Sequence, residues 1–194
     1  KRFVKWLYLS VIFQNKYVLG FAGGSKFHKD LFRYYGMNEN RIFLMPMMVD
    51  NTKFLNKNRL NPDVFTFLFV GRLVEDKNVE TLIQEFSANF SDKNAILKIV
   101  GDGDEKEYLS YKYTSAKIVF TGKKFNQDLI DIFHSSSCFV CPSNFEPWGL
   151  VVNEALSAGL PVIATKQVGA HFDLIKGRET GFIAEDMQVF GEMM

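Results

Sequence analysis

Short apolar runs alternate with segments of helical periodicity from residue 64 onward, and this alternation constrains the fold more than any other feature of the sequence. Residues 64–70 are almost continuously apolar, as expected of a strand that is buried on both faces. Residues 79–90 then carry apolar side chains at helical spacing. Alternating strands and helices predict an α/β fold, a parallel sheet with helices on both faces. The further strands are predicted at 96–100, 118–120, 138–141 and 162–164, and the further helices at 105–113, 129–133 and 150–158.

The first 50 residues are predicted to form a separate unit. Their pattern is helix, strand, helix, strand, with helices at 3–12 and 26–35 and strands at 18–22 and 42–45. A polar stretch at 51–62, rich in Asn and Lys, follows them and is typical of a linker. We therefore expect a first segment at 1–50, a linker at 51–62 and a main domain at 63–194.

Charge and cysteine content exclude several classes of protein. Lys plus Arg is 23 and Asp plus Glu is 22 in 194 residues, so the sequence does not suggest a globally basic nucleic-acid binder. Two cysteines are too few for a disulfide framework, which favours a reducing, cytoplasmic location. Cys138 and Cys141 have C-x2-C spacing, but in a strand this spacing points the side chains to opposite faces, so we expect buried thiols rather than a zinc site. No apolar run is long enough to cross a bilayer.

The opening stretch carries an excess of positive charge. Such a run is ordinarily a solvated face, and the alternative is contact with acidic lipid or an acidic acceptor, which would place the protein peripherally at the inner face of the membrane. Because the chain begins at Lys1 and shows no signal-peptide pattern, we expect it to be a piece of a longer protein. Up to Arg33, the only acidic residue is Asp30, against the cations Lys1, Arg2, Lys5, Lys16, Lys26, Lys29 and Arg33.

The loops after the predicted strands are where a ligand is expected, because doubly wound sheets bind ligands at the carboxyl ends of their strands. Each of these loops contains a glycine, and a residue without a side chain lets a ligand approach the backbone closely. The loops are residues 71–73, 101–103, 121–124, 142–149 and 165–169.

The loop at 142–149 opens a predicted helix, with Gly149 at the helix start. The first N–H groups of a helix have no internal partner, and together with the helix dipole they form an anion site that suits a diphosphate. Glu146 and Glu154 flank this turn, and ionised carboxylates accept hydrogen bonds from hydroxyls of a sugar or a ribose. The alternative for the two glutamates is a first-turn charge and an ordinary surface residue.

Two cations follow the first strand of the main domain. Arg72 comes directly after it, and Lys77 lies five residues further on, before the next helix. Cations at this edge suit a pyrophosphate leaving group, because they stabilise the negative charge that develops as a glycosidic bond breaks. The alternative is a pair of solvated surface cations.

These residues together resemble the GT4-type family of retaining glycosyltransferases. The resemblance rests on Gly71-Arg72-Leu73 with Lys77, on the run from Pro142 to Ala155 with its E-x7-E spacing, and on Gly159 to Thr165 in the same order. It covers roughly residues 64–184, with a fainter match at 25–50. It implies the carboxy-terminal, donor-binding domain of the GT-B fold, whose halves are Rossmann-like.

The resemblance also implies that residues before about Pro46 are the tail of the acceptor-side domain, and that the family's closing helices lie beyond Met194. A chain of this extent is therefore not expected to be active alone. The implied reaction transfers a sugar from a UDP- or GDP-sugar to a glycan or lipid-linked acceptor with retention, as in polysaccharide biosynthesis. The nucleotide sugar is then a substrate, and neither a metal nor a further cofactor is expected.

The family's functional residues carry over to matching positions of this chain. The diphosphate would be held by Arg72, Lys77 and the backbone at 149–151, the transferred sugar by Glu146 and the ribose by Glu154. The implied catalytic residues are Glu146, Arg72 and Lys77. The implied donor-binding residues are Gly71, Arg72, Lys77, Lys123, Lys124, Glu146, Gly149, Leu150, Val151 and Glu154. Lys123 and Lys124 would lie by the base.

Several signals remain open or are discounted. Asp102-x-Asp104 resembles a metal-binding pair, but we expect Asp104 to cap the next helix instead. His171 is expected in a loop that faces the crevice. Asn78 stands where the family often has Gly after the lysine. Two other functions stay open, namely a nucleotide-sugar epimerase of related architecture and a binding module that has lost catalysis.

Overall fold

The computed structural model describes residues 2–24, 28–45, 47–55 and 62–194. The chain forms two compact units, Lys1–Met48 and Val49–Met194. In the described part, no helix combines the length and the apolar composition needed to span a bilayer.

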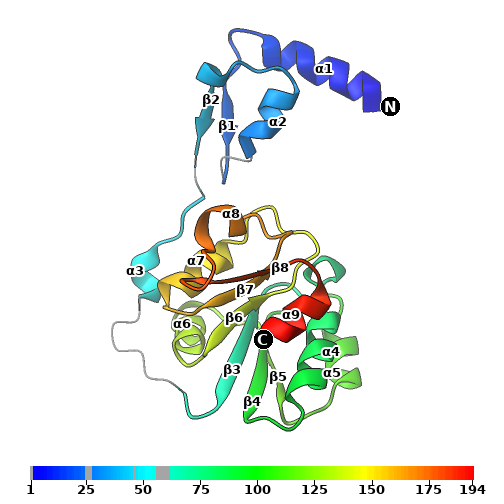
Figure 1. Ribbon diagram of the computed structural model, residues 1–194, viewed down its shortest axis with the longest axis vertical. Coiled ribbons are helices and arrows are strands. Elements are labelled where there is room, and N and C mark those ends of the chain that lie inside the picture. Colours follow the sequence, from blue (N-terminus) through cyan, green and yellow to red (C-terminus); the bar gives the residue numbers. More distant parts are fainter. Residues whose placement is uncertain (1, 25–27, 46, 56–61) are drawn as a thin grey trace. The chain divides into compact units, whose positions relative to one another are not determined.

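The first unit contains the predicted order of helix, strand, helix, strand. Helix α1 (Arg2–Gln14) is followed by strand β1 (Gly20–Ala22), helix α2 (Lys29–Tyr34), a 3-10 turn η2 (Glu39–Arg41) and strand β2 (Ile42–Leu44). The two strands pair in parallel (Figure 1), with Gly20 opposite Ile42. The helix predicted at 26–35 is observed as Lys29–Tyr34, and residues 26–27 of the prediction lie outside the described residues.

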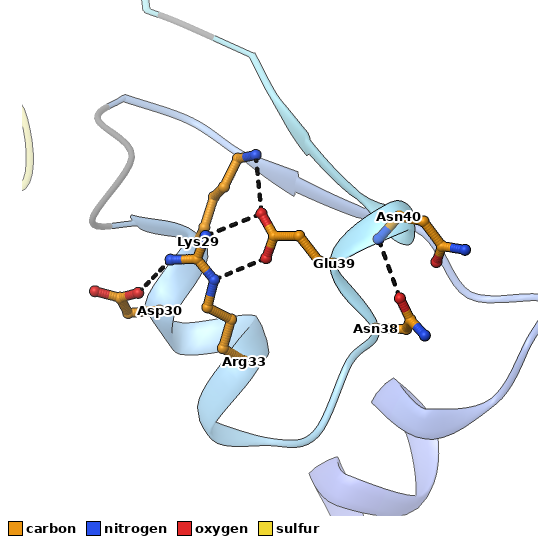
Figure 2. A network of polar contacts seen from close by, with 6 residues as sticks. All are labelled: Lys29, Asp30, Arg33, Asn38, Glu39 and Asn40. Carbon is orange, nitrogen blue, oxygen red and sulfur yellow. Dashed lines mark hydrogen bonds and ion pairs between the residues drawn. The ribbon is translucent and has the colours of Figure 1, made fainter.

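A network of ion pairs closes the turn between α2 and η2 (Figure 2). The guanidinium of Arg33 donates from Nε to Glu39 Oε2 at 2.8 Å, from Nη2 to Glu39 Oε1 at 2.9 Å and from Nη1 to Asp30 Oδ1 at 2.6 Å. The Lys29 ammonium lies 3.4 Å from Glu39 Oε1. These contacts, Arg33 first, lower the pKa of Glu39 to about 2. Part of the excess positive charge of the opening stretch is therefore neutralised by an acidic residue that lies just beyond it.

The second unit is built on a six-stranded parallel sheet with the order β5-β4-β3-β6-β7-β8. Counted along the chain from β3, this is the doubly wound order 3-2-1-4-5-6. The predicted strands are confirmed, and β8 is one that the sequence pattern did not show. The strands are β3 (Phe65–Val70), β4 (Ala95–Val100), β5 (Ile118–Gly122), β6 (Cys138–Cys141), β7 (Val162–Thr165) and β8 (Gly181–Ala184).

Helices cover both faces of this sheet, as predicted (Figure 1). One buried cluster joins β3 and β4 to side chains of α4, α5 and α9, and the other joins the opposite face to α6, α7 and α8. Cys138 belongs to the first cluster and Cys141 to the second, so the expectation of two buried thiols on opposite faces is confirmed. The helices are α3 (Asn51–Phe54), α4 (Val79–Phe90), α5 (Lys106–Lys112), α6 (Asn126–His134), α7 (Leu150–Ser157), α8 (His171–Leu174) and α9 (Met187–Met193).

Helix α3 occupies the first part of the segment expected as a linker at 51–62. Asp50 caps it by accepting from the N–H of Thr52 at 3.2 Å, and Phe54 packs edge-on against Phe133 of α6 at 5.4 Å between ring centroids. The ring Nε2 of His134 lies 2.9 Å from the carbonyl oxygen of Phe54. A four-residue helix shows no periodicity in sequence, and its one aromatic contact is made far along the chain. Residues 56–61 of the expected linker lie outside the described residues.

We predict that Gly101→Ala destabilises the second unit. A Cβ at Gly101 would lie 1.8 Å from the carbonyl oxygen of Gly71, so the loops after β3 and β4 would have to separate. Strain of this kind costs about 3 kcal/mol. Chemical denaturation of the variant measures the loss. Gly177→Ala is the control, because a Cβ there meets nothing within 4 Å. Equal stability of the two variants would contradict the close approach.

Candidate functional site

The strand order reverses between β3 and β6, the position at which doubly wound sheets form a crevice. From β3 the chain continues to β4 and β5 on one side of the sheet, whereas β6 leads to β7 and β8 on the other side. Doubly wound sheets bind ligands where the order reverses in this way, at the carboxyl ends of the strands. The loops that meet here follow β3 and β6. We call residues 71–78 the Lys77 loop and residues 142–149 the Glu146 loop.

An ion pair joins the two loops. The ammonium of Lys77 contacts the Oε2 of Glu146, and the two side chains are only 15% and 19% exposed. An interaction sheltered from water in this way is screened less by salt than a surface pair. The backbone N–H of Asn144 also donates to the carbonyl oxygen of Asp76 at 2.8 Å. The structure thus brings Lys77 and Glu146 together, 69 positions apart in sequence.

Gly149 sets the start of α7 beside Glu146. It has φ +92°, and a Cβ there would lie 3.2 Å from both Glu146 Cγ and Val168 Cγ1, so glycine is required by conformation and by space. Among the described residues, no acceptor is found for the backbone amides of Gly149, Leu150 and Val151. Unpaired amides at a helix start are the donors that an anion needs.

The Glu146 loop is also tied to the loop after β7. The N–H of Glu146 donates to the carbonyl oxygen of Gln167 at 3.2 Å, and the N–H of Gly169 donates to that of Glu146 at 2.8 Å. Gly169 lies so close that a Cβ would be 2.0 Å from the carbonyl oxygen of Pro147. Gly169 is a supporting residue that the sequence showed only as a glycine at the end of a strand-end loop.

A second group of predicted residues lines a cleft of about 690 Å³ at the ends of β3, β4 and β5. Arg72 is exposed there, and no ion pair or hydrogen bond of its side chain is found within the described ranges. The lining residues are Val70, Gly71, Arg72, Val100, Gly101, Asp102, Gly103, Asp104, Lys123 and Lys124. The predicted donor residues therefore fall into two groups, one at the crevice and one along this cleft.

Asp104 does not cap α5, so that expectation is wrong. The residue at the cap position is Glu105, and its side chain makes no capping hydrogen bond. The chain turns at Gly103, which has φ +156°, and Asp104 lies one position too early to reach the first helical amides. Asp102 instead accepts from the N–H of Gly103 at 2.9 Å and pairs with Lys106 at 3.3 Å. These contacts, Gly103 first, lower the pKa of Asp102.

Glu154 lies on the second turn of α7. It is half-buried, and burial raises the pKa of its carboxyl group. Within the part of the chain that the structure describes, its carboxylate has no hydrogen-bond partner. A partly desolvated carboxylate without a donor is unfavourable for stability.

His171 is not in a loop, which corrects a second expectation. It is the first residue of α8 and is buried, with Nδ1 2.7 Å from the carbonyl oxygen of Val168. Because a carbonyl only accepts, Nδ1 carries the proton. The ring also contacts that of Phe172 in a tilted arrangement, with 3.7 Å between centroids and 36° between the ring planes. These contacts make His171 a packing residue of the second unit.

The fold and these loops define a doubly wound α/β domain whose strand order reverses between β3 and β6. A sequence model of the family described as "Glycosyl transferases group 1" matches residues 50–189, and the chain belongs to this family. It comprises the carboxy-terminal domain of a GT-B fold, as the resemblance implied.

Relatives and solved structures agree with this membership. A glycosyltransferase of Methanocaldococcus jannaschii is 32% identical over 152 residues, which cover 76% of this chain and 39% of that protein. The capsular polysaccharide biosynthesis glycosyltransferase CapM of Staphylococcus aureus is 33% identical over 156 residues, covering 76% and 40%. The structure of Anabaena HepE in complex with UDP superposes with a TM-score of 0.77 at 20% identity, over 96% of this chain and 56% of that one. The chain thus spans about 40% of the length of these curated relatives.

We predict that Glu154→Gln raises stability at neutral and higher pH. Burial raises the pKa of Glu154 in the folded state. The protein is therefore most stable below the unfolded pKa of 4.5, where the carboxyl group is neutral, and it loses stability as the pH rises through the folded pKa and the group ionises. The amide removes this loss, so the melting temperature should rise by about 1–3 °C at pH 8. The gain should disappear below pH 4.5. Thermal unfolding at both pH values measures it.

Glu179→Gln is the control for this prediction, because Glu179 is an exposed glutamate in the same unit. A gain of the same size for both variants, or one that persists at low pH, would show that burial of Glu154 is not its source.

Proposed function

We propose that the whole protein is a glycosyltransferase that moves a sugar from a UDP- or GDP-sugar to a glycan or lipid-linked acceptor with retention of anomeric configuration. The second unit would supply the donor site. The observation that carries this proposal is the Lys77–Glu146 pair at the switch point of the sheet, beside the first amides of α7, for which the described residues offer no acceptor. Family membership supports the reaction class, and the relative CapM supports a glycan product.

The crevice is suited to a leaving diphosphate. When the bond between the anomeric carbon and the diphosphate oxygen breaks, negative charge develops on the diphosphate. The ammonium of Lys77 and the amides at Gly149 and Leu150 are fixed donors that stabilise this charge, and Arg72 adds a second cation from the adjoining cleft. Glu146 would orient Lys77 and accept from a hydroxyl of the transferred sugar. The acceptor oxygen then bonds to the anomeric carbon, and its proton passes to the departing phosphate.

The cleft and Glu154 are suited to the nucleoside. The cleft volume of about 690 Å³ lies in the range of small-molecule sites, and Lys123 and Lys124 line it. Glu154 is a carboxylate with free acceptor capacity, so it would bind the ribose hydroxyls. The likeness to a protein solved with UDP supports a nucleoside diphosphate as the ligand class.

The first unit belongs to the same proposal. We assign residues 1–48 to the end of the acceptor-side domain. The exposed cations at Arg2 and Lys5 are candidates for contact with an acidic acceptor or a lipid surface.

We predict that Lys77→Ala in the full-length protein weakens binding of UDP or GDP by about 10- to 100-fold, because a charge-assisted contact to the diphosphate is lost. Binding of uridine or guanosine should change little, since neither has a phosphate. Isothermal titration calorimetry measures both affinities.

Two further variants serve as comparisons for Lys77→Ala. Lys112→Ala removes an ion-paired lysine on α5, which contacts Glu80 at 2.7 Å and does not line the cleft, so affinity should be unchanged. Glu154→Ala should weaken nucleoside and nucleoside diphosphate alike, because both contain ribose. Equal weakening of both ligands by Lys77→Ala would remove Lys77 from the phosphates.

A product assay separates the proposal from the epimerase alternative. With a nucleotide sugar as the only substrate, the full-length protein should leave the configuration of the sugar unchanged, and transfer should require an added acceptor. Product analysis by NMR distinguishes the two reactions. Conversion of the donor without an acceptor would favour an epimerase, and failure to bind any nucleotide would favour a binding module of another kind.

A further inference from the structure

Asn78 lies where the Lys77 loop becomes helix α4, in a backbone conformation that few side chains tolerate. Its φ of +53° and ψ of 37° are left-handed. Glycine adopts this conformation without strain, and asparagine adopts it more readily than most other residues. The backbone alone therefore does not require asparagine, so what this residue adds beyond glycine is a side-chain amide.

That amide reaches the Glu146 loop. The Nδ2 of Asn78 donates to the carbonyl oxygen of Pro142 at 3.3 Å, and its Oδ1 accepts from the hydroxyl of Thr81 at 2.7 Å. Because the carbonyl of Pro142 only accepts, the amide nitrogen must face it, and the Thr81 hydroxyl keeps the oxygen on the other side. Both contacts are part-buried, so water competes with them less.

Three consecutive residues thus join the two loops. Asp76 accepts from the backbone of Asn144, Lys77 pairs with Glu146, and Asn78 donates to Pro142. The first contact is made by backbone atoms, and the second is made by the two proposed donor-binding side chains. The third is a side-chain contact that involves neither Lys77 nor Glu146. The hydroxyl of Thr81 links the same side chain to the first turn of α4.

We propose that Asn78 is a positioning residue of the donor site, whose side-chain amide holds the Lys77 loop at a fixed separation from the Glu146 loop. This inference rests on the proposed function. A flexible lysine loses conformational entropy when it binds a phosphate. This entropic cost of binding is smaller when the loop that carries the lysine is already held in place. Asn78 would therefore increase donor affinity through Lys77, without touching the donor.

The test compares Asn78→Gly with Asn126→Gly in the full-length protein. Both replace an asparagine with positive φ, +53° and +49°, by the residue that suits this conformation best. Asn126 is exposed at the start of α6 and is absent from the lining of the cleft. We expect the melting temperature of both variants to stay near that of the wild type. The affinity of Asn78→Gly for UDP or GDP, whichever the wild type binds, should fall by about 3- to 10-fold, the size of one hydrogen bond. The affinity of Asn126→Gly should be unchanged.

A second comparison distinguishes positioning from a general structural effect. In a Lys77→Ala background, adding Asn78→Gly should cause no further loss of affinity, because the group that Asn78 positions is gone. A full additional loss in that background, or equal affinities of Asn78→Gly and Asn126→Gly, would overturn the inference and leave the proposed function intact. A wild-type protein that binds neither UDP nor GDP would overturn the proposed function itself.

Discussion

The parallel pairing of β3 with β6 is the constraint on which the rest of the structure depends. Phe67 and Leu68 lie opposite Cys138 and Phe139, although about 70 residues separate the two strands in sequence. The strand order reverses at this pairing. The loop after β3 therefore meets the loop after β6 at the carboxyl ends of the two strands. The contact between Lys77 and Glu146 and the place of the start of α7 beside it follow from this pairing.

The contacts between these loops explain how charged groups remain in a part-buried site. Lys77 or Glu146 alone would be costly there, because an unpaired charge loses its hydration without compensation. Paired, they neutralise each other, and the backbone contact from Asn144 to Asp76 keeps the loops at that separation. Gly149 then places the first amides of α7 beside the pair. This arrangement is the basis of the proposed diphosphate site.

Unfavourable features lie in the Lys77 loop and on α7. Asn78 has positive φ, and the carboxyl group of Glu154 is partly desolvated with no hydrogen-bond partner among the described residues. Local strain of this kind persists where the surrounding structure over-determines it, and it concentrates at functional sites. Here the surroundings are two buried clusters, one on each face of the sheet, in which Phe67 and Phe139 are almost completely enclosed. The core stabilises the fold enough to tolerate these local costs.

The sequence by itself determined the kind and order of most elements, because periodicity is carried by neighbouring residues: α4 and β6 lie where the pattern predicts them. It also singled out Lys77 and Glu146 through their motifs. Only the tertiary structure decided that these two side chains touch, that α3 packs on α6, and that His171 is a packing residue of a short helix. A helix of four residues is too short to show the helical periodicity of apolar residues in sequence. Contacts between distant loops depend on the order of the strands in the sheet, and residues adjacent in sequence do not encode that order.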